Sequence, residues 1–463
     1  MHQAVQFNAE LIRRYDITGP RYTSYPTALQ FHEGFDTELY RRYVRLSNDE
    51  LIPAPLSLYV HLPFCHSLCY YCGCNKKVTR HPEHGVAYLQ RLQREIDLRG
   101  QLFDRDRLVN QLHFGGGTPT FFDGEQLRQL MRALGQAFTF SPAGEREFSI
   151  EVDPRTVDHE RLAHLAELGF NRISLGVQDT DEAVQRAINR VQNPAATMEM
   201  VAVSRKLGFE SVSVDLIYGL PLQTRQSFRA TLETVIAERP DRLAVYSYAH
   251  MPQVFRSQRM ISEADLPSPG AKLELMDLTI GMLVEAGYVY IGMDHFALPD
   301  DDLARAKVNG HLHRNFQGYS THSGCDLVGL GVSAISRIGD SFCQNLKEIP
   351  RWTSVLDQGQ LPVWRGIGMT TEDRLRSAII EAVMCQGRVD FGDIENRFGV
   401  DFADHFALEI HQLALLARDG LIELEEYGFS ATAEGRLLLR AIAMVFDEYQ
   451  PRENARPRFS RVI

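Results

Sequence analysis

A long central part of the chain alternates short β-type runs with longer segments in which apolar residues recur every three or four positions. The expected strands are LSLYV ending at Val60, NQLHF ending at Phe114, EFSIEV ending at Val152, NRISLGV ending at Val177, SVSVDLIYG ending at Gly219 and RLAVYSYA ending at Ala249. Segments between them, such as ERLAHLAELGF and MEMVAVSRKLGF, have helical spacing, and Gly208 is placed to end the second of these helices. This alternation predicts an α/β fold with a parallel sheet and right-handed crossovers, either doubly wound or a closed or partial TIM-type barrel.

Polar or glycine-rich residues follow each expected strand. They are the segment from Cys65 to Cys74 and the segments GGGTPT, EVDP, GVQD, DLIYGLP and YAHMP. In parallel α/β folds the ligand site gathers at the carboxyl ends of the strands. Six such segments in succession therefore predict one shared site.

The chain changes character after about residue 300. VNGHLHRNFQGYSTHSG is polar and irregular, and helical patterns dominate from Thr371 to Phe446, ending in a pattern typical of a winged helix. The acidic run Glu423, Glu425 and Glu426 disfavours DNA binding, so a packing or lid role is preferred. We expect an N-terminal arm, a barrel and a mainly helical, winged-helix-like C-terminal domain that contains an active-site segment and a helical module. The expected ranges are 1–35, 36–300 and 301–463, with the segment at 311–337 and the module at about 370–447.

Composition narrows the classes of protein that fit. A hydrophobic content of 44% and a charged content of 24% over 463 residues are those of a soluble globular protein. No apolar stretch reaches the length of a transmembrane helix, and the N-terminus has no signal-peptide core, so a cytoplasmic protein without a membrane partner is expected. The net charge of −11 argues against nucleic-acid binding. An anionic substrate must therefore be bound by a local basic pocket.

Four of the seven cysteines crowd into ten residues. Cys65, Cys69, Cys72 and Cys74 form C-x3-C-x2-C-x-C, a spacing that favours metal or redox chemistry in a cytosolic protein. On the cysteines alone, zinc and an iron–sulfur cluster are comparable alternatives. Three cysteine ligands would leave one iron of a cubane open to substrate. The isolated Cys325, Cys343 and Cys385 are interpreted as small buried hydrophobic residues.

The C-x3-C-x2-C core, the GGGTPT segment at 115–120 and the strand-end Glu151 together resemble the radical S-adenosylmethionine (SAM) superfamily. The resemblance implies that SAM chelates the open iron and is cleaved by one electron to a 5′-deoxyadenosyl radical. The glycines permit close approach of the backbone to the methionine amino group. Glu151 can accept hydrogen bonds from ribose hydroxyls or the amino group.

Further segments narrow the resemblance. They are GPRYTSYPTALQF at 19–31, YVHLPFCHSLCYYCGCNK at 59–76, DLIYGLPLQT at 215–224, IGMDHFALPDD at 291–301, HRNFQGYSTH at 313–322 and the C-terminal FSRVI. They are similar to the oxygen-independent coproporphyrinogen III oxidases along essentially the whole chain. Haem-carrying radical SAM relatives typically lack the CGC and RNFQGY segments. A haem-binding chaperone, a radical SAM methyltransferase and a porphyrin-ring-opening enzyme remain the alternatives.

The family resemblance implies a [4Fe–4S] cluster and two SAM molecules. The cluster ligands are Cys65, Cys69 and Cys72. Positions around the cluster-bound SAM are Tyr59, Tyr71, Gly116, Glu151 and Ile335, and those around the second SAM are Gly117, Thr118, Gln178, Arg190, Asp215 and Ala249. Arg190 can bind a carboxylate with two parallel hydrogen bonds, and Tyr71 can pack on adenine.

The same resemblance implies that two propionates of coproporphyrinogen III become vinyl groups, giving protoporphyrinogen IX. An electron donor, a terminal electron acceptor and a monomeric enzyme are expected. Cys74 is interpreted as an accessory to the site, His61 as a strand histidine with proton handling as the alternative, and Phe316 and Gln317 as active-site positions. Arg21 and Arg314 are hypothetical partners of the substrate propionates.

Overall fold

The computed structural model describes residues 5–322 and 324–450, so the FSRVI segment lies outside the described residues. The chain forms two compact units, each assembled from separate segments. The barrel unit comprises residues 31–275 and 324–368, and the second unit comprises the described parts of 1–30, 276–323 and 369–463. The three-part division expected from the sequence, with boundaries at 35 and 300, remains a proposal.

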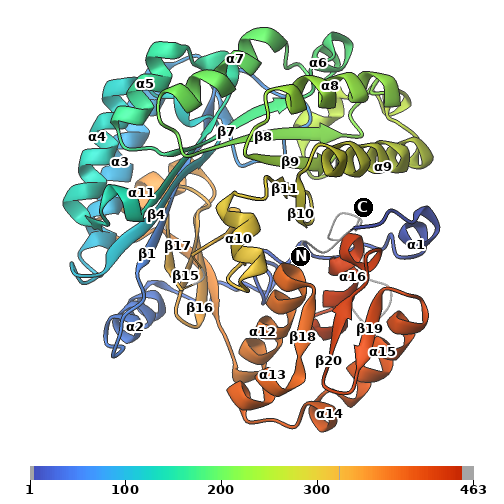
Figure 1. The fold of residues 1–463 in the computed structure, drawn as a ribbon. Coiled ribbons are helices and arrows are strands. Elements are labelled where there is room, and N and C mark those ends of the chain that lie inside the picture. The colour runs from blue at the N-terminus through green and yellow to red at the C-terminus, as the bar shows by residue number, and fades with distance from the viewer. Residues whose placement is uncertain (1–4, 323, 451–463) are drawn as a thin grey trace. The chain divides into compact units, whose positions relative to one another are not determined.

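A parallel sheet forms the centre of the barrel unit (Figure 1). Its strands, in spatial order, are β9 (Arg242–Ser247), β8 (Ser211–Tyr218), β7 (Arg172–Gln178), β6 (Glu147–Val152), β4 (Leu108–Gly116) and β1 (Leu56–Leu62). All neighbours in this series pair in parallel. The six strands expected from the alternating pattern are confirmed, and their order follows the chain because each crossover places the next strand beside the last.

The sheet continues past β1 with strands from the later part of the chain. These are β14 (Asp326–Leu330), β15 (Ile335–Ile338), β16 (Ser341–Asn345) and β17 (Val363–Gly368). Strand β14 is parallel to β1, and the next three form an antiparallel meander. A short strand β5 (Thr139–Phe140) pairs with β4.

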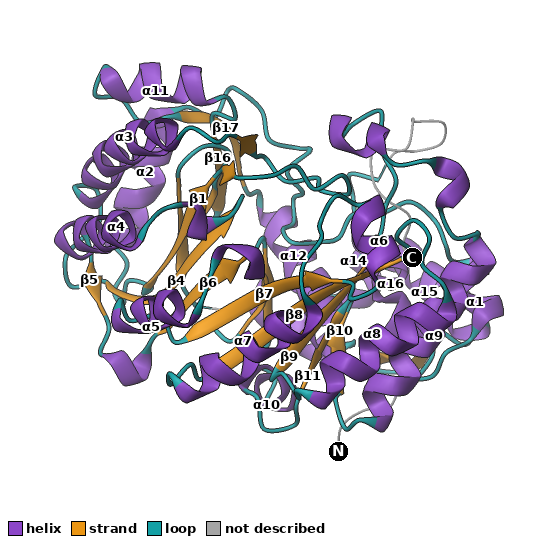
Figure 2. Cartoon of the chain, turned by 90° about the horizontal axis from the view of Figure 1, so that it is seen from above, coloured by secondary structure: helices purple, strands orange, loops and turns teal. Residues whose placement is uncertain are grey.

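Helices cover one face of the curved parallel sheet (Figure 2). The helices of the barrel unit are α2 (Thr37–Asn48), α3 (Pro82–Gly100), α4 (Gly124–Ala137), α5 (His159–Glu167), α6 (Glu182–Ala187), α7 (Pro194–Lys206), α8 (Arg225–Ala237) and α11 (Ile349–Asp357), and α9 (Pro269–Glu285) extends from it into the second unit. Caps explain several starts: the Asp123 side chain accepts from the backbone of Gln126, whose side chain accepts in return from Asp123. Gly208, with φ +91, follows α7 as expected.

The second unit contains short hairpins and a helical module. Its helices are α1 (Ala9–Arg14), α10 (Asp302–Val308), α12 (Thr371–Gln386), α13 (Phe391–Phe398), α14 (Phe402–His405), α15 (Ala407–Arg418) and α16 (Leu439–Ala443). Its strands are β10 (Val289–Gly292), β11 (His295–Ala297), β12 (His313–Asn315), β13 (Gly318–Ser320), β18 (Arg388–Asp390), β19 (Ile422–Glu425) and β20 (Gly428–Ala431). The expected wing is the β19–β20 hairpin, and β18 adds a third strand beside β20.

Among the described residues, no helix combines the length and the apolar character needed to cross a membrane.

A fully buried ion pair within α3 is hydrogen-bonded to residues of the β14–β16 segment and of α11. Arg99 Nε donates to Glu95 Oε1 at 3.1 Å, and both side chains have 0% exposure. Asn345 Nδ2 and Trp352 Nε1 donate to the same carboxylate at 2.7 and 3.0 Å, and the Gly331 backbone N–H donates to it at 2.9 Å. The carboxylate is thus satisfied by four donors, which a buried charge requires.

The variant Glu95→Gln should destabilise the barrel unit by about 3 to 5 kcal/mol, because it leaves Arg99 buried without its counter-charge. The measurement is urea unfolding followed by the fluorescence of Trp352 and Trp364, the two tryptophans of the chain. The control, Arg94→Ala, removes a half-exposed partner of Asp357 and should change stability by less than about 1 kcal/mol. Equal effects of the two variants would contradict the assignment.

Candidate functional site

The cysteine loop leaves the carboxyl end of β1 and runs between two short parallel strands, β2 (Phe64–Cys65) and β3 (Lys77–Val78). Its backbone is anchored by side chains. Lys76 Nζ and Ser257 Oγ each donate to the Cys72 carbonyl at 2.9 Å, and Gln258 Nε2 donates to the Tyr71 carbonyl at 3.0 Å. These contacts fix the loop through its carbonyl groups.

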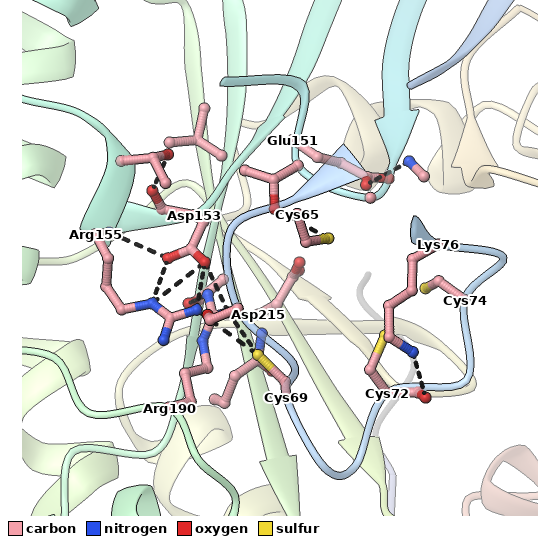
Figure 3. Close-up of a pocket in the computed structure, with 18 of the residues that line it drawn as sticks. Cys65, Cys69, Cys72, Cys74, Lys76, Glu151, Asp153, Arg155, Arg190 and Asp215 are labelled. Carbon is pink, nitrogen blue, oxygen red and sulfur yellow. Dashed lines mark hydrogen bonds and ion pairs between the residues drawn. The ribbon is translucent and has the colours of Figure 1, made fainter. Parts of the chain in front are cut away.

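A cavity of about 700 Å³ lies beside this loop, at the carboxyl ends of the parallel strands. Figure 3 shows cysteines, carboxylates and arginines around it. The sequence-predicted residues that line it are Cys65, Cys69, Tyr71, Cys72, Cys74, Gly116, Gly117, Thr118, Glu151, Gln178, Arg190 and Asp215. Five of the six strand-end segments therefore contribute to this one pocket, and YAHMP at 248–252 does not line it.

The glycines after β4 permit a close approach that other residues would prevent. Gly116 has φ +109, and a Cβ there would lie 2.5 Å from the His61 ring. A Cβ on Gly117 would lie 2.6 Å from the Pro63 carbonyl carbon and 2.8 Å from the Phe64 oxygen. Gly117 N–H donates to Leu62 O at 2.9 Å. The GGG segment thus packs directly against the chain that leads into Cys65.

Two carboxylates in the pocket have different environments. Burial acts to raise the pKa of Glu151, but the hydrogen bonds from His113 at 3.0 Å and from Gly116 N–H at 3.2 Å outweigh it, and the pKa lies below its usual value. Burial and the Glu151 charge raise the pKa of Asp215 to about 7, although Ser174 donates a hydrogen bond to it at 3.2 Å. Glu151 is therefore ionised at neutral pH, whereas Asp215 gains or loses its proton near neutral pH.

The loop cysteines also differ in their surroundings. Burial raises the pKa of Cys65 to about 11, although Thr118 Oγ1 lies 3.5 Å from its sulfur and acts in the opposite direction. A hydrogen bond from Cys74 and the nearby Lys76 lower the pKa of Cys72 to about 6, against burial. Cys69 is buried and contacts two arginines, whereas Cys74 is exposed. All of these cysteines are free thiols.

Three predicted residues, two on β1 and one on β15, are absent from the pocket lining. Tyr59 stacks on His113 with ring centroids 5.8 Å apart. His61 Nε2 donates to the Asn75 carbonyl at 2.9 Å, so its Nδ1 accepts from the Tyr59 hydroxyl at 3.0 Å. Burial lowers the pKa of His61, which favours this neutral form. A Cβ on Gly329 would lie 2.5 Å from the Ile335 carbonyl oxygen, and Gly329 pairs with Tyr59 in the sheet.

The remaining predicted positions lie farther along the chain. Ala249 follows β9, and its carbonyl accepts from the same Gln258 amide that holds Tyr71. Phe316 and Gln317 form the turn between β12 and β13 in the second unit, and Gln317 N–H donates to Asn315 Oδ1 at 2.8 Å. Both turn residues belong to the second unit, whereas the described pocket lies within the barrel unit.

Arg21 and Arg314 lie together in the second unit. Arg21 forms an ion pair with Asp294, and Arg314 Nε donates to the Arg21 carbonyl at 3.3 Å. The Arg314 guanidinium lies over the Tyr319 ring at 4.8 Å. Arg314 is buried, and its Nη1 has no hydrogen-bond partner among the described residues.

Sequence reasoning missed several residues of the site. Asp153, Arg155 and Lys76 line the pocket, and Gln258 anchors the loop. The sequence could have indicated Asp153, because it follows Glu151 by two positions at the end of β6. Side chains two positions apart in an extended strand point to the same side. Gln258 had no such signal, since it lies 187 residues from Tyr71 in the chain.

The pocket suits an iron–sulfur cluster. Cys65, Cys69 and Cys72 all contribute to its lining, and the cavity has room for a cluster with a ligand beside it. Within the described ranges, no three His, Cys, Asp or Glu side chains are grouped as ligands of a single metal ion. In a cubane each thiolate binds its own iron, so the three sulfurs need not converge on one point.

The barrel fold and this cysteine pocket define the radical SAM class. Residues 59–235 match the model of the Radical SAM superfamily, and residues 369–438 match that of the HemN C-terminal domain. Radical SAM proteins bind a [4Fe–4S] cluster and SAM, and the donor set here fits both groups.

The full-length relatives identify the family within that class. The chain is 51% identical over 463 residues to the oxygen-independent coproporphyrinogen III oxidase of Pseudomonas aeruginosa, covering 100% of both chains. It is 48% identical over 461 residues to that of Escherichia coli, covering 100% of this chain and 99% of the relative. The solved coproporphyrinogen III oxidase from Escherichia coli, described as a radical SAM enzyme, superposes with a TM-score of 0.92 over 96% of this chain and 100% of that one. The chain belongs to the oxygen-independent coproporphyrinogen III oxidase family.

The variant Gly117→Ala should lower the iron bound after anaerobic reconstitution, because the added methyl group collides with the backbone just before Cys65. Iron and sulfide analysis with the visible absorption of the cluster is the measurement. Gly144→Ala is the matched control, since a Cβ at Gly144 meets nothing within 4 Å. Full cluster content in Gly117→Ala would show that the close approach at Gly117 does not constrain the loop.

Proposed function

We propose that the chain catalyses the oxygen-independent conversion of coproporphyrinogen III to protoporphyrinogen IX. The observation that carries this proposal is the 51% identity to a named oxygen-independent coproporphyrinogen III oxidase along the entire length of both chains. The cysteine pocket at the carboxyl ends of the sheet supports it, because it combines four thiols with carboxylates and arginines.

Cys65, Cys69 and Cys72 hold the [4Fe–4S] cluster in this proposal. Positions around the first SAM are Tyr59, Tyr71, Gly116, Glu151 and Ile335, and those around the second are Gly117, Thr118, Gln178, Arg190, Asp215 and Ala249. When bound, the cluster supplies the electron that cleaves SAM to the 5′-deoxyadenosyl radical. Glu151 accepts hydrogen bonds from a SAM amino or hydroxyl group as an ionised carboxylate.

The substrate loses one hydrogen atom from the β-carbon of each of two propionates. Each propionate then releases carbon dioxide and one further electron, and a vinyl group remains. The electron passes to a terminal acceptor, and a separate donor reduces the cluster. The protein acts as a cytoplasmic monomer without nucleic-acid or membrane partners. Cys74, exposed beside Cys72, is an accessory to the chemistry, and Phe316 and Gln317 contact the reacting groups.

Arg21 and Arg314 bind propionate carboxylates of the substrate. Their support is the contact between Arg314 and the Arg21 carbonyl and the buried Arg314 Nη1 that lacks a partner among the described residues. An unpaired buried N–H costs free energy, and a carboxylate oxygen would satisfy it with a charge-assisted hydrogen bond.

The variant Arg314→Ala should raise the Michaelis constant for coproporphyrinogen III about tenfold or more, because a hydrogen bond to a charged group contributes about 1.5 to 3 kcal/mol. Arg21→Ala should act in the same direction. Steady-state kinetics and direct titration of the protein with the porphyrin measure both effects. Arg305→Ala, which removes an exposed arginine of the same unit, should leave binding unchanged. Unchanged Michaelis constants in both variants would refute the assignment.

The function itself is tested with the protein reconstituted anaerobically with iron and sulfide. It is incubated with SAM, a reductant, an electron acceptor and coproporphyrinogen III. The expected product has lost two carbon dioxide units and four hydrogen atoms, and 5′-deoxyadenosine appears with it. Cys69→Ser should abolish both products, whereas Cys325→Ser, outside the pocket lining, should retain them.

Other products would indicate a different activity. A methylated or linear tetrapyrrole indicates a radical SAM methyltransferase or ring-opening enzyme. Haem transfer without vinyl formation indicates the haem-binding chaperone. Zinc in place of a cluster returns the cysteine loop to a structural role.

A further inference from the structure

Two arginines converge on one cysteine sulfur of the pocket. Arg190 Nη1 lies 3.5 Å from Cys69 Sγ, and Arg155 Nη2 lies 3.7 Å from it. Both distances are those of N–H···S hydrogen bonds. Figure 3 shows the two guanidinium groups reaching Cys69 from the same side of the cavity. Cys69 is thus the one loop cysteine for which the described residues show two arginine donors on its sulfur.

A single carboxylate fixes both arginines. Asp153 Oδ2 accepts from Arg155 Nη2 at 2.7 Å and from Arg190 Nη1 at 3.1 Å, and Asp153 Oδ1 accepts from Arg155 Nε at 3.0 Å. Burial acts to raise the pKa of Asp153, but the two arginines outweigh it and hold the pKa below its usual range. Asp153 therefore remains ionised and clamps both guanidinium groups.

The backbone also restrains this cluster of charges. The Asp153 side chain accepts from the Arg155 N–H at 3.1 Å, which caps the short turn after β6. Arg190 Nη2 donates to the Gly176 carbonyl on β7 at 2.6 Å. Asp153 and Arg190 are buried, with 9% and 6% exposure. Since two cations face one anion, the group presents a net charge of +1 to Cys69.

We propose that Arg155 and Arg190, held by Asp153, raise the reduction potential of the cluster that Cys69 ligates. The inference rests on the proposed function, which places a cluster on Cys69. Hydrogen bonds to ligand sulfurs and nearby positive charge both favour the more negative, reduced cluster. The two arginines thus ease the one-electron reduction on which SAM cleavage depends.

Substitution of Arg155 tests the effect on the potential more directly than substitution of Arg190. Arg190 was also assigned to the second SAM, so its loss would change ligand binding together with the potential. Arg155 acts through Cys69 and is a positioning residue with no other assigned role. Arg155→Gln removes the charge, whereas Arg155→Lys keeps the charge but loses the planar arrangement of donors.

The experiment is a potentiometric titration of the reconstituted protein without SAM, followed by the electron paramagnetic resonance signal of the reduced cluster. Arg155→Gln should shift the midpoint potential to more negative values, and Arg155→Lys should shift it less. The control is Arg132→Gln, which removes one positive charge at an exposed position of the same unit and should leave the potential unchanged.

An unchanged potential in Arg155→Gln with full iron content overturns the proposal. An equal shift in Arg132→Gln also overturns it, because net charge alone would then explain the effect. If Arg155→Gln binds no cluster, Arg155→Lys decides the question. A wild-type potential in Arg155→Lys with full iron content assigns Arg155 a structural role and overturns the proposed effect on the potential. Absence of a cluster from the unaltered protein overturns the proposed function as well. Vinyl formation by the unaltered protein, together with an unshifted potential in Arg155→Gln, overturns only the proposal about the potential.

Discussion

The functional pocket depends on hydrogen bonds that hold the cysteine loop by its backbone. The carbonyl groups of Leu68, Tyr71, Cys72 and Asn75 accept from side chains of the barrel unit that lie outside the loop. A loop without regular secondary structure has few internal partners for its carbonyls, so these external donors define its path. Since the contacts are made to the backbone, the thiols of Cys65, Cys69 and Cys72 still line the cavity.

Much of this arrangement was predictable because it is local in sequence. The alternation of strand and helix patterns placed all six parallel strands, and the segments that follow them supplied most of the pocket lining. The cysteine spacing and the GGGTPT segment are also continuous in the chain, so the sequence alone indicates their physical consequences. The polar residues that follow each strand predicted that these segments share one site, because parallel strands direct their carboxyl ends to one side.

The sequence does not indicate which residues far apart in the chain form hydrogen bonds with one another. Gln258 reaches Tyr71 across 187 positions, and Arg155 reaches Cys69 across 86. A single arginine or glutamine in a loop has no periodicity, and its partner is chosen by the fold. Strands β14 to β17 illustrate the same limit. They extend the sheet beside β1, although they come after β10–β11 in the chain, because the register of β14 with β1 is set by packing and not by sequence proximity.

The two carboxylates of the pocket show how one fold gives similar groups different charges. Glu151 is stabilised as an anion by His113 and the Gly116 N–H, and its charge is one reason why Asp215 resists ionisation. A ligand that brings positive charge between them would weaken this repulsion and lower the pKa of Asp215. SAM carries a sulfonium and an amino group, so its binding would couple to release of the Asp215 proton. The repulsion between Glu151 and Asp215 therefore favours a cation over a neutral molecule of the same shape beside these two carboxylates.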